Sequence, residues 1–236
     1  MTETLRIFIG YDHRQPVSYH VLSHSILERA TKPVSITPLV LPTLPLRRVG
    51  LTPFTFSRFL VPHLMGYKDW ALFLDIDIML RADIAELFAL VDKKYSVMVV
   101  KNDMAFEWAS VMLFNCEKCE TLTPEHVKTG GGLLKMEWAH PEQVGALPSE
   151  WNHLVGYDAP RPDAKLVHFT QGIPAFPETQ DSEFGEEWRV EAVKAFSSVP
   201  WKELMGNSVH ASAVYDRLTL KRSAAAVAEM MDKSAA

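Results

Sequence analysis

The sequence predicts a layered α/β protein with a mixed, mainly parallel sheet flanked by helices. Strand-like apolar runs alternate with helix-like patterns through residues 1–115, which is typical of such layered folds. Several of these runs are continuously apolar, as expected of strands that are buried on both faces. A chain of 236 residues without an internal repeat or a clear linker suits one large domain over residues 1–236.

The first elements form a strand–helix–strand pattern. Leu5–Gly10 is a short apolar run closed by glycine and predicts the first strand. Pro16 can begin a helix without losing a needed N–H group, and apolar residues recur behind it at helical spacing. Val34–Leu41 predicts a second strand, and the proline-rich stretch 42–53 predicts a surface loop.

The middle of the chain continues the alternation. Phe56–Met65 has a helical pattern that Pro62 should shorten or kink. Trp70–Leu74 is continuously apolar and predicts a buried strand. Asp83 and Glu86 have the spacing of a capping box, which predicts a helix reaching Leu90.

The remaining elements are shorter. We expect strands at Tyr95–Val100, Val111–Phe114 and Ala164–His168. Glycine, proline and polar residues are frequent over 121–162, so loops should dominate there. The stretch 209–231 has helical character, and docking on the protein body is the default interpretation of such a terminal amphipathic helix.

Composition excludes some classes of partner and compartment. A formal net charge of -5 with scattered Lys and Arg disfavours nucleic acid, which usually needs a basic patch. Two cysteines, in one C-x-x-C pair at Cys116 and Cys119 without further zinc-ligand spacing, fit a reducing compartment better than a disulfide scaffold. The chain has neither a signal-peptide pattern nor an apolar run of about 18 residues. We therefore expect a cytoplasmic protein without a transmembrane segment.

The segment with the strongest functional signal is Asp75-Ile-Asp77, directly after the apolar run 70–74. Two aspartates separated by one residue project to the same side of an extended chain. Ligand sites of open α/β sheets lie at the carboxyl ends of strands. A hard divalent cation would relieve the repulsion between the two carboxylates and leave positions for phosphate oxygens.

Two other interpretations of the acidic pair remain open. The aspartates could simply end a strand and cap a turn. They could also form the nucleophilic pair of a phosphatase-type hydrolase, but the residues that follow, Ile78-Met-Leu, do not suit that pattern. A later acidic metal-binding motif is also missing, which makes the phosphatase interpretation the weaker one.

The acidic pair belongs to a series of five segments that follow one another along the chain. They are Ile7-Phe-Ile-Gly-Tyr-Asp12, Ser57-Arg-Phe-Leu-Val-Pro62, Leu72-Phe-Leu-Asp-Ile-Asp77, Ser110-Val-Met-Leu-Phe-Asn115 and Val167-His-Phe-Thr-Gln-Gly172. This order resembles glycosyltransferase family 8 and its bacterial relatives over residues 5–178. The resemblance implies a GT-A fold, a Rossmann-like sheet that binds nucleoside diphosphate sugars, and transfer of a hexose-like sugar with retention of configuration.

The resemblance also implies roles for individual residues. Asp75 and Asp77, completed by His168, would hold Mn²⁺ or Mg²⁺ on the donor diphosphate, and the imidazole favours Mn²⁺. The expected donor-binding residues are Gly10, Tyr11, Asp12, Arg58, Asp75 and Gly172. The donor would be a nucleoside diphosphate sugar, in first place a UDP-sugar, and the acceptor an unknown glycan, lipid or small molecule. Asp12 could instead cap the helix that follows it.

The chain departs from the family pattern at three places. Trp108-Ala-Ser110 stands where the family has an Asn, and Gly130-Gly-Gly-Leu-Leu-Lys135 occupies the region of an acidic–amide pair. The stretch 172–176 lacks the family's Lys. These gaps leave sugar recognition open. They motivate a second hypothesis, a nucleotide-sugar-binding protein of the same fold with weakened catalysis.

Acceptor contacts are the least constrained part of the site. Asp103 follows an apolar strand in a loop that could face the acceptor. Trp151 could stack on a sugar ring, with Asn152 beside it, although burial is the commoner fate of Trp. We divide the expected domain into a nucleotide-binding part over about 1–120, an acceptor and metal-completing part over about 121–180, and a helical segment over about 181–236.

Overall fold

The computed structural model describes residues 4–103 and 105–196. These residues contain almost all of the first of two units, Met1–Ala192; of the second unit, Val193–Ala236, only residues 193–196 are described. The helix expected over 209–231 lies outside the described residues.

A six-stranded sheet with the order β2-β1-β3-β6-β5-β7 forms the centre of the first unit. Five of its strands run parallel to one another, and β6 runs antiparallel between β3 and β5. The prediction of a mixed, mainly parallel sheet is therefore confirmed. Its strands are β1 (Leu5–Gly10), β2 (Val34–Leu39), β3 (Trp70–Leu74), β5 (Val97–Val99), β6 (Val111–Asn115) and β7 (Val144–Ala146).

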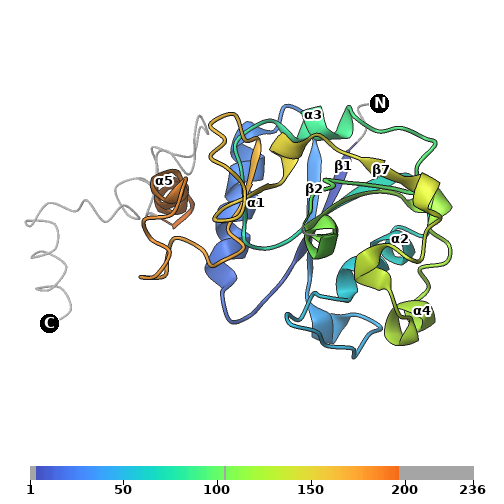
Figure 1. The fold of residues 1–236 in the computed structure, drawn as a ribbon. Helices are drawn as coiled ribbons and strands as arrows, with labels where there is room; N and C mark the ends of the chain where they lie inside the picture. Colours follow the sequence, from blue (N-terminus) through green and yellow to red (C-terminus); the bar gives the residue numbers. More distant parts are fainter. Residues whose placement is uncertain (1–3, 104, 197–236) are drawn as a thin grey trace, which may run out of the picture. The chain divides into compact units, whose positions relative to one another are not determined.

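Helices cover both faces of this sheet (Figure 1), with α1 and α2 on opposite sides. Helix α1 begins at Pro16, as predicted, and buries Val21, Leu22 and Ile26. Pro62 lies in the first turn of α2 and follows a 3-10 turn over Ser57–Leu60, so the predicted helix is split rather than kinked. The α-helices of the described residues are α1 (Pro16–Arg29), α2 (Val61–Leu64), α3 (Ile84–Phe88), α4 (Pro124–Thr129) and α5 (Gly185–Phe196).

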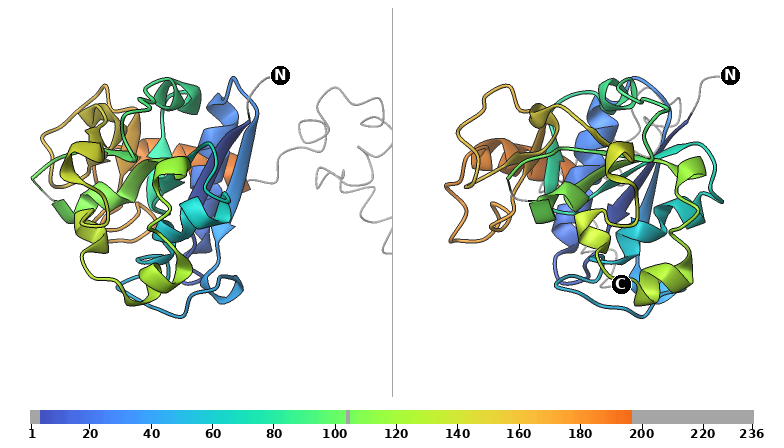
Figure 2. Two further views of the ribbon diagram at one scale, coloured as in Figure 1. Left: turned by 90° about the vertical axis from the view of Figure 1, so that its right-hand side faces the viewer. Right: turned by 45° about the vertical axis from the view of Figure 1, so that its right-hand side comes forward.

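A second sheet of three strands, in the order β4-β9-β8, lies beside the first. Its strands are β4 (Ile78–Leu80), β8 (His153–Leu154) and β9 (Leu166–His168). Strand β9 pairs antiparallel with β4 and parallel with β8. Because β4 follows β3 after only three residues, the acidic pair lies in the connection between the two sheets. Figure 2 shows the fold from two further sides.

Two apolar cores correspond to the two sheets. The larger core surrounds the six-stranded sheet and includes the strands β1 and β3 over their full buried length. The smaller core joins Val21 of α1, Val167 of β9 and Trp188 of α5, together with Phe169 and Ile173. The connection that carries the acidic pair is thus held from both sides by packed side chains.

Several predicted elements need correction. Strand β2 ends at Leu39 because a 3-10 turn over Leu41–Thr43 follows. The region 121–162 is more structured than expected, since Thr123 caps α4 by accepting a hydrogen bond from the His126 N–H and β7 and β8 also lie there. The cap at Asp83 is confirmed, because its side chain accepts a hydrogen bond from the Ala85 N–H, but α3 ends at Phe88.

Candidate active site

The acidic pair is fixed by backbone hydrogen bonds to two distant segments. The N–H of Asp75 donates to the carbonyl of Ser110 over 2.9 Å, which extends the pairing of β3 with β6 by one residue. The carbonyl of Asp77 accepts from the N–H of Phe169 over 3.0 Å, next to the pairing of β4 with β9. The two carboxylates therefore occupy a rigid position at the carboxyl end of β3.

His168 reaches the acidic pair through strand register. It ends β9 and lies opposite Ile78, the residue that follows Asp77. Its Nε2 lies 3.2 Å from Oδ1 of Asp77. Residues more than 90 positions apart in the chain thus become neighbours because a short antiparallel pair joins them.

The other imidazole nitrogen is held by Asn152. The Nδ1 atom of His168 lies 3.2 Å from Oδ1 of Asn152. The Asn152 amide nitrogen donates to the Ser110 hydroxyl over 3.1 Å and to the Glu107 carbonyl over 3.4 Å, which fixes the orientation of the amide. Because Oδ1 can only accept, Nδ1 carries a proton and Nε2 faces Asp77.

The three side chains suit a divalent metal ion. One ligand atom from each of Asp75, Asp77 and His168 lies within 4.8 Å of the others. Oδ1 of Asp75 and Oδ1 of Asp77 are buried, and within the described residues their partners are the ion-pair contacts with Arg58 and His168, without a well-formed hydrogen bond. Such carboxylate oxygens are costly unless a cation or further donor satisfies them. Two carboxylates and one imidazole are a ligand set that Mn²⁺ or Mg²⁺ accepts.

Arg58 lies beneath the metal-binding group and is buried. Its Nη1 atom is 3.0 Å from Oδ1 of Asp75 and donates to the carbonyl of Ala109 over 2.6 Å. The guanidinium lies over the ring of Phe73 at 4.9 Å. In this structure Arg58 therefore compensates the charge of Asp75, while it also lines the cavity described below.

Electrostatics at the site favour protonated groups when no cation is bound. Burial raises the pKa of Asp75 to about 7 despite the positive charge of Arg58, and the charge of Asp77 adds to the rise. Burial by itself would lower the pKa of His168, but the negative charge of Asp77 outweighs it and raises this pKa to about 8. A divalent cation would reverse both tendencies by stabilising the deprotonated forms.

A cavity of about 260 Å³ opens over the metal-binding group. Its walls combine the metal-binding side chains with Arg58, Glu107, three threonines and three apolar residues. They are Leu51, Thr52, Phe54, Thr55, Arg58, Asp75, Asp77, Glu107, Leu134, His168 and Thr170. Glu107 was not predicted as a site residue, because the sequence gives no signal that the antiparallel β6 would bring its preceding turn to the acidic pair.

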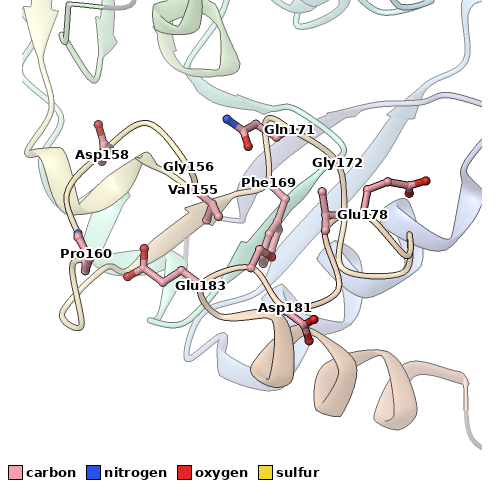
Figure 3. A pocket seen from close by; sticks show the side chains of 12 residues that line it. Val155, Gly156, Asp158, Pro160, Phe169, Gln171, Gly172, Glu178, Asp181 and Glu183 are labelled. Atoms are coloured by element: carbon pink, nitrogen blue, oxygen red, sulfur yellow. The ribbon is translucent and has the colours of Figure 1, made fainter.

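A larger cavity of about 490 Å³ lies on the other side of the segment that follows β9 (Figure 3). Residues alternate along this segment: His168 and Thr170 line the smaller cavity, whereas Phe169 and Gln171 line the larger one. Gly172, expected to bind the donor, also lines the larger cavity. Among the described residues, four carboxylates and no Lys or Arg line the larger cavity, which disfavours a diphosphate there.

Asp12, which follows β1, binds the side chain of Arg14 instead of capping the next helix. Asp12 is 1% exposed, and both its oxygens accept hydrogen bonds from the Arg14 guanidinium. Helix α1 begins after Gln15 without a side-chain cap, so Asp12 does not cap it. Gly10 is required by close packing, since a Cβ atom there would lie 2.4 Å from the Phe54 ring. The Tyr11 ring contacts that of Tyr19 edge-on.

The residues considered for acceptor binding are not brought together. Trp151 is 1% exposed and belongs to the core, so a sugar cannot stack on it in this structure. Asn152 is equally buried and orients His168 instead. Asp103 is exposed in the loop after β5.

The two cysteines have a structural role. Both thiols are free and completely buried. Burial raises the pKa of the Cys116 thiol to about 12 and that of Cys119 well above its usual value. Neither redox chemistry nor metal binding is favoured for such thiols.

Among the described residues, no helix combines the length and apolar character needed to cross a membrane.

Comparison with known proteins identifies the fold. No family model matches the chain. The bifunctional glycosyltransferase WbbM shares 16% identity at a TM-score of 0.64, covering 87% of this chain and 51% of WbbM. The glycosyltransferase GlyE of Streptococcus pneumoniae shares 16% identity at a TM-score of 0.62, covering 81% and 60%. The chain thus spans only about half to three fifths of these two structures.

A smaller structure is covered almost completely. The galactosyltransferase LgtC, solved with donor and acceptor sugar analogues, shares 13% identity at a TM-score of 0.59, covering 84% of this chain and 99% of LgtC. These likenesses show that the chain has the GT-A fold, as the sequence predicted. None of them favours the phosphatase interpretation of the acidic pair.

Sequence comparison adds a relative from a plant. Protein CDI of Arabidopsis thaliana is 38% identical over 219 residues, and the match covers 78% of this chain and 84% of the plant protein. Identity at this level over most of both chains indicates common descent and a shared fold. The chain therefore belongs to the family of Protein CDI.

Proposed function

We propose that this protein is a metal-dependent glycosyltransferase that moves a sugar from a nucleoside diphosphate sugar, in first place a UDP-sugar, to an acceptor hydroxyl. The supporting observation is the group formed by Asp75, Asp77 and His168 at the carboxyl end of β3, whose ligand atoms converge within 4.8 Å of one another and include two buried carboxylate oxygens. In open α/β sheets this is the edge where ligands bind. Solved structures that share this fold are glycosyltransferases, one of them in complex with donor and acceptor sugar analogues.

Asp75, Asp77 and His168 would hold Mn²⁺, or Mg²⁺, against the donor diphosphate. The bound cation would act as a Lewis acid that stabilises the charge developing on the diphosphate. Asn152 holds the imidazole so that Nε2 faces Asp77. Arg58 compensates the charge of Asp75 and lines the cavity.

In the transfer, the acceptor oxygen would bond to the anomeric carbon while the bond from that carbon to the diphosphate breaks. The electron pair of the breaking bond stays on the diphosphate, which also takes up the hydroxyl proton. The resemblance to family 8 supports attack from the face of the leaving group and hence retention. The cavity walls would contribute by holding the two reacting oxygens close to the anomeric carbon. We place this activity in the cytoplasm, a reducing compartment that suits the two free thiols.

Calorimetric titration tests the proposal directly. UDP and GDP are titrated into the purified protein with Mn²⁺ and then with EDTA, and we expect one of them to bind only when Mn²⁺ is present. Asp77→Ala should abolish this binding. Asp181→Ala is the matched control, because Asp181 is exposed and lines the larger, acidic cavity. If UDP, GDP and their sugars all fail to bind with Mn²⁺, the proposal is wrong.

Enzymatic transfer is tested next. The protein with Mn²⁺ is incubated with a panel of nucleotide sugars, and slow donor hydrolysis is followed by mass spectrometry. We expect hydrolysis of one donor by the wild type and none by Asp77→Ala. The stereochemistry of the released sugar, read by NMR at early times, should match that of the donor.

A further inference from the structure

The cavity over the metal-binding group contains a third carboxylate whose role is not explained by the metal. Glu107 lines this cavity together with Asp75 and Asp77. It lies in the 3-10 turn Ala105–Ser110, immediately before β6. The antiparallel pairing of β6 with β3 places the start of β6 beside the end of β3, and so carries Glu107 to the acidic pair.

Glu107 is separate from the metal-binding group. Its Oε2 atom lies 3.7 Å from Nδ1 of His168, on the side of the imidazole that faces away from Asp77. The three ligand atoms that converge within 4.8 Å come from Asp75, Asp77 and His168, without Glu107. Glu107 thus approaches Nδ1 of His168 and not the Nε2 atom that faces Asp77.

The Glu107 carboxylate lacks donors of its own. Its side chain is only 13% exposed, and among the described residues no hydrogen bond to its two carboxylate oxygens occurs, although its backbone carbonyl accepts from Ser110 and Asn152. The ion-pair contact with His168 compensates part of its charge, but a largely buried carboxylate without a hydrogen-bond donor is unfavourable. Hydrogen-bond donors from a ligand would relieve this cost.

The size and charge of the cavity identify the part of the ligand that would supply the donors. A volume of about 260 Å³ is below the range of about 300–1,000 Å³ for pockets that enclose drug-sized ligands. It suits a cation with one sugar ring rather than a whole nucleotide sugar. The diphosphate is anionic and carries no donor for a carboxylate, whereas sugar hydroxyls are donors.

We propose that Glu107 recognises the transferred sugar by accepting hydrogen bonds from its hydroxyl groups, and so determines which nucleotide sugar is used. This inference rests on the proposed function. Glu107 binds substrate in this assignment and does not act through His168.

The test compares sugar recognition with nucleotide recognition. UDP, UDP-glucose, UDP-galactose, UDP-N-acetylglucosamine and UDP-xylose are titrated with Mn²⁺ into the wild type, Glu107→Gln and Glu107→Ala. For the UDP-sugar that the wild type binds best, the ratio of its Kd to that of UDP should rise by about tenfold or more in both variants, since a hydrogen bond to a charged group is lost. The Kd of UDP itself should stay within about twofold.

Glu137→Gln is the matched control, because Glu137 is exposed and lines a neighbouring pocket rather than this cavity. It should leave the ratio unchanged. Equal weakening of UDP and UDP-sugars in the Glu107 variants would overturn the inference and assign Glu107 a structural role at His168. An unchanged ratio would overturn it as well. Failure of the proposed function is seen separately, as the absence of Mn²⁺-dependent binding of UDP, GDP and their sugars by the wild type, and would remove both.

Discussion

The side chains of His168 and Asn152 meet inside the protein, with Nδ1 of the imidazole 3.2 Å from the amide oxygen. Both residues are at most 2% exposed. The amide cannot rotate without losing its bonds to Ser110 and Glu107, so it holds a single orientation and tautomer of the ring. Partners of this kind are part of a metal site, because they set the direction and basicity of the ligand.

Asn152→Ala should therefore weaken metal binding without removing a ligand. We expect Mn²⁺ affinity, measured by calorimetry at a fixed UDP concentration, to fall about tenfold to a hundredfold, the usual effect of losing such a partner. Ser149→Ala serves as the control, because Ser149 is exposed and begins the 3-10 turn Ser149–Trp151 that directly precedes Asn152. Wild-type affinity in Asn152→Ala would show that His168 keeps its orientation by packing alone.

Metal affinity should depend steeply on pH. Without a cation, Asp75 has a pKa of about 7 and His168 one of about 8. Both groups must be deprotonated to bind a cation, so protons compete with the metal below these values. We expect Mn²⁺ affinity to level off above pH 8 and to fall progressively as the pH drops from 8 to 6. Calorimetric titrations with Mn²⁺ in buffers of different ionisation enthalpy measure the number of protons released on binding. We expect proton release at pH 6.5 and little at pH 9.

The same shifts have a consequence for the folded state. The pKa of Asp75 lies above its ordinary value of 3.8 and that of His168 above 6.5. The native state therefore binds more protons than the unfolded chain between pH 4 and 8, and the metal-free protein should lose stability as the pH rises through this range. Mn²⁺ should restore the free energy of unfolding most strongly at pH 8 and above. Urea unfolding in EDTA and in Mn²⁺ at pH 6 and 8.5 measures both trends.

Local sequence was sufficient for the elements whose ends carry their own signals. The strands β1 and β3 have the predicted bounds because a continuous apolar run ends at Gly10 in one and before Asp75 in the other. Helix α1 begins at Pro16 because proline suits the first helical turn. Asp75, Asp77 and His168 could be named because the order of the motifs resembled a known family.

Other parts of the site depend on strand direction and register, which the sequence does not encode locally. The apolar run of β6 is the same whether the strand runs parallel or antiparallel, and only the antiparallel pairing brings Glu107 to Asp75. Asn152 looked like an exposed loop residue beside Trp151. Both are buried, because β8 pairs with β9 directly after them.

Arg58 should stabilise the site through its pairing with Asp75. Removing it in Arg58→Met leaves the Asp75 carboxylate buried without a counter-charge, which costs about 3–5 kcal/mol when one partner of a buried pair is lost. Urea unfolding in EDTA should show a larger loss at pH 8.5 than at pH 6, because protonation neutralises Asp75 at the lower pH. The exposed Arg47 provides the control Arg47→Met, with an expected change within about 0.5 kcal/mol.

A double-mutant cycle separates the charge pairing from the loss of packing. If the pairing dominates, adding Asp75→Asn to Arg58→Met should recover part of the lost free energy of unfolding, since no unpaired carboxylate remains. Strict additivity of the two substitutions would contradict the pairing and attribute the loss to the contact of Arg58 with Phe73. The two proteins that carry Asp75→Asn, the single and the double variant, should also lack Mn²⁺-dependent stabilisation.

Glu191 of α5 should stabilise the packing of this helix against α1, and its contribution to the free energy of unfolding should depend on pH. Its carboxylate is 3% exposed and pairs with His24 over 2.5 Å and with Arg29 over 2.9 Å, while Trp188 of the same helix packs in the smaller core. Burial alone would raise the pKa of Glu191, but the hydrogen bonds from Arg29 and His24 outweigh it and lower the pKa below its usual 4.5. The stabilisation is therefore present above pH 4.5 and is lost as the pH falls through the lowered pKa.

Glu191→Gln should thus reduce the free energy of unfolding at pH 7 by about 1–3 kcal/mol, the range for hydrogen bonds to a charged group. The difference from the wild type should shrink as the pH falls below 4.5. Glu186→Gln, which removes an exposed pair with Arg189 on the same helix, should change stability by less than about 1 kcal/mol. Equal effects of the two substitutions at pH 7 would show that the link between α1 and α5 depends on Trp188 and its apolar neighbours rather than on the buried carboxylate.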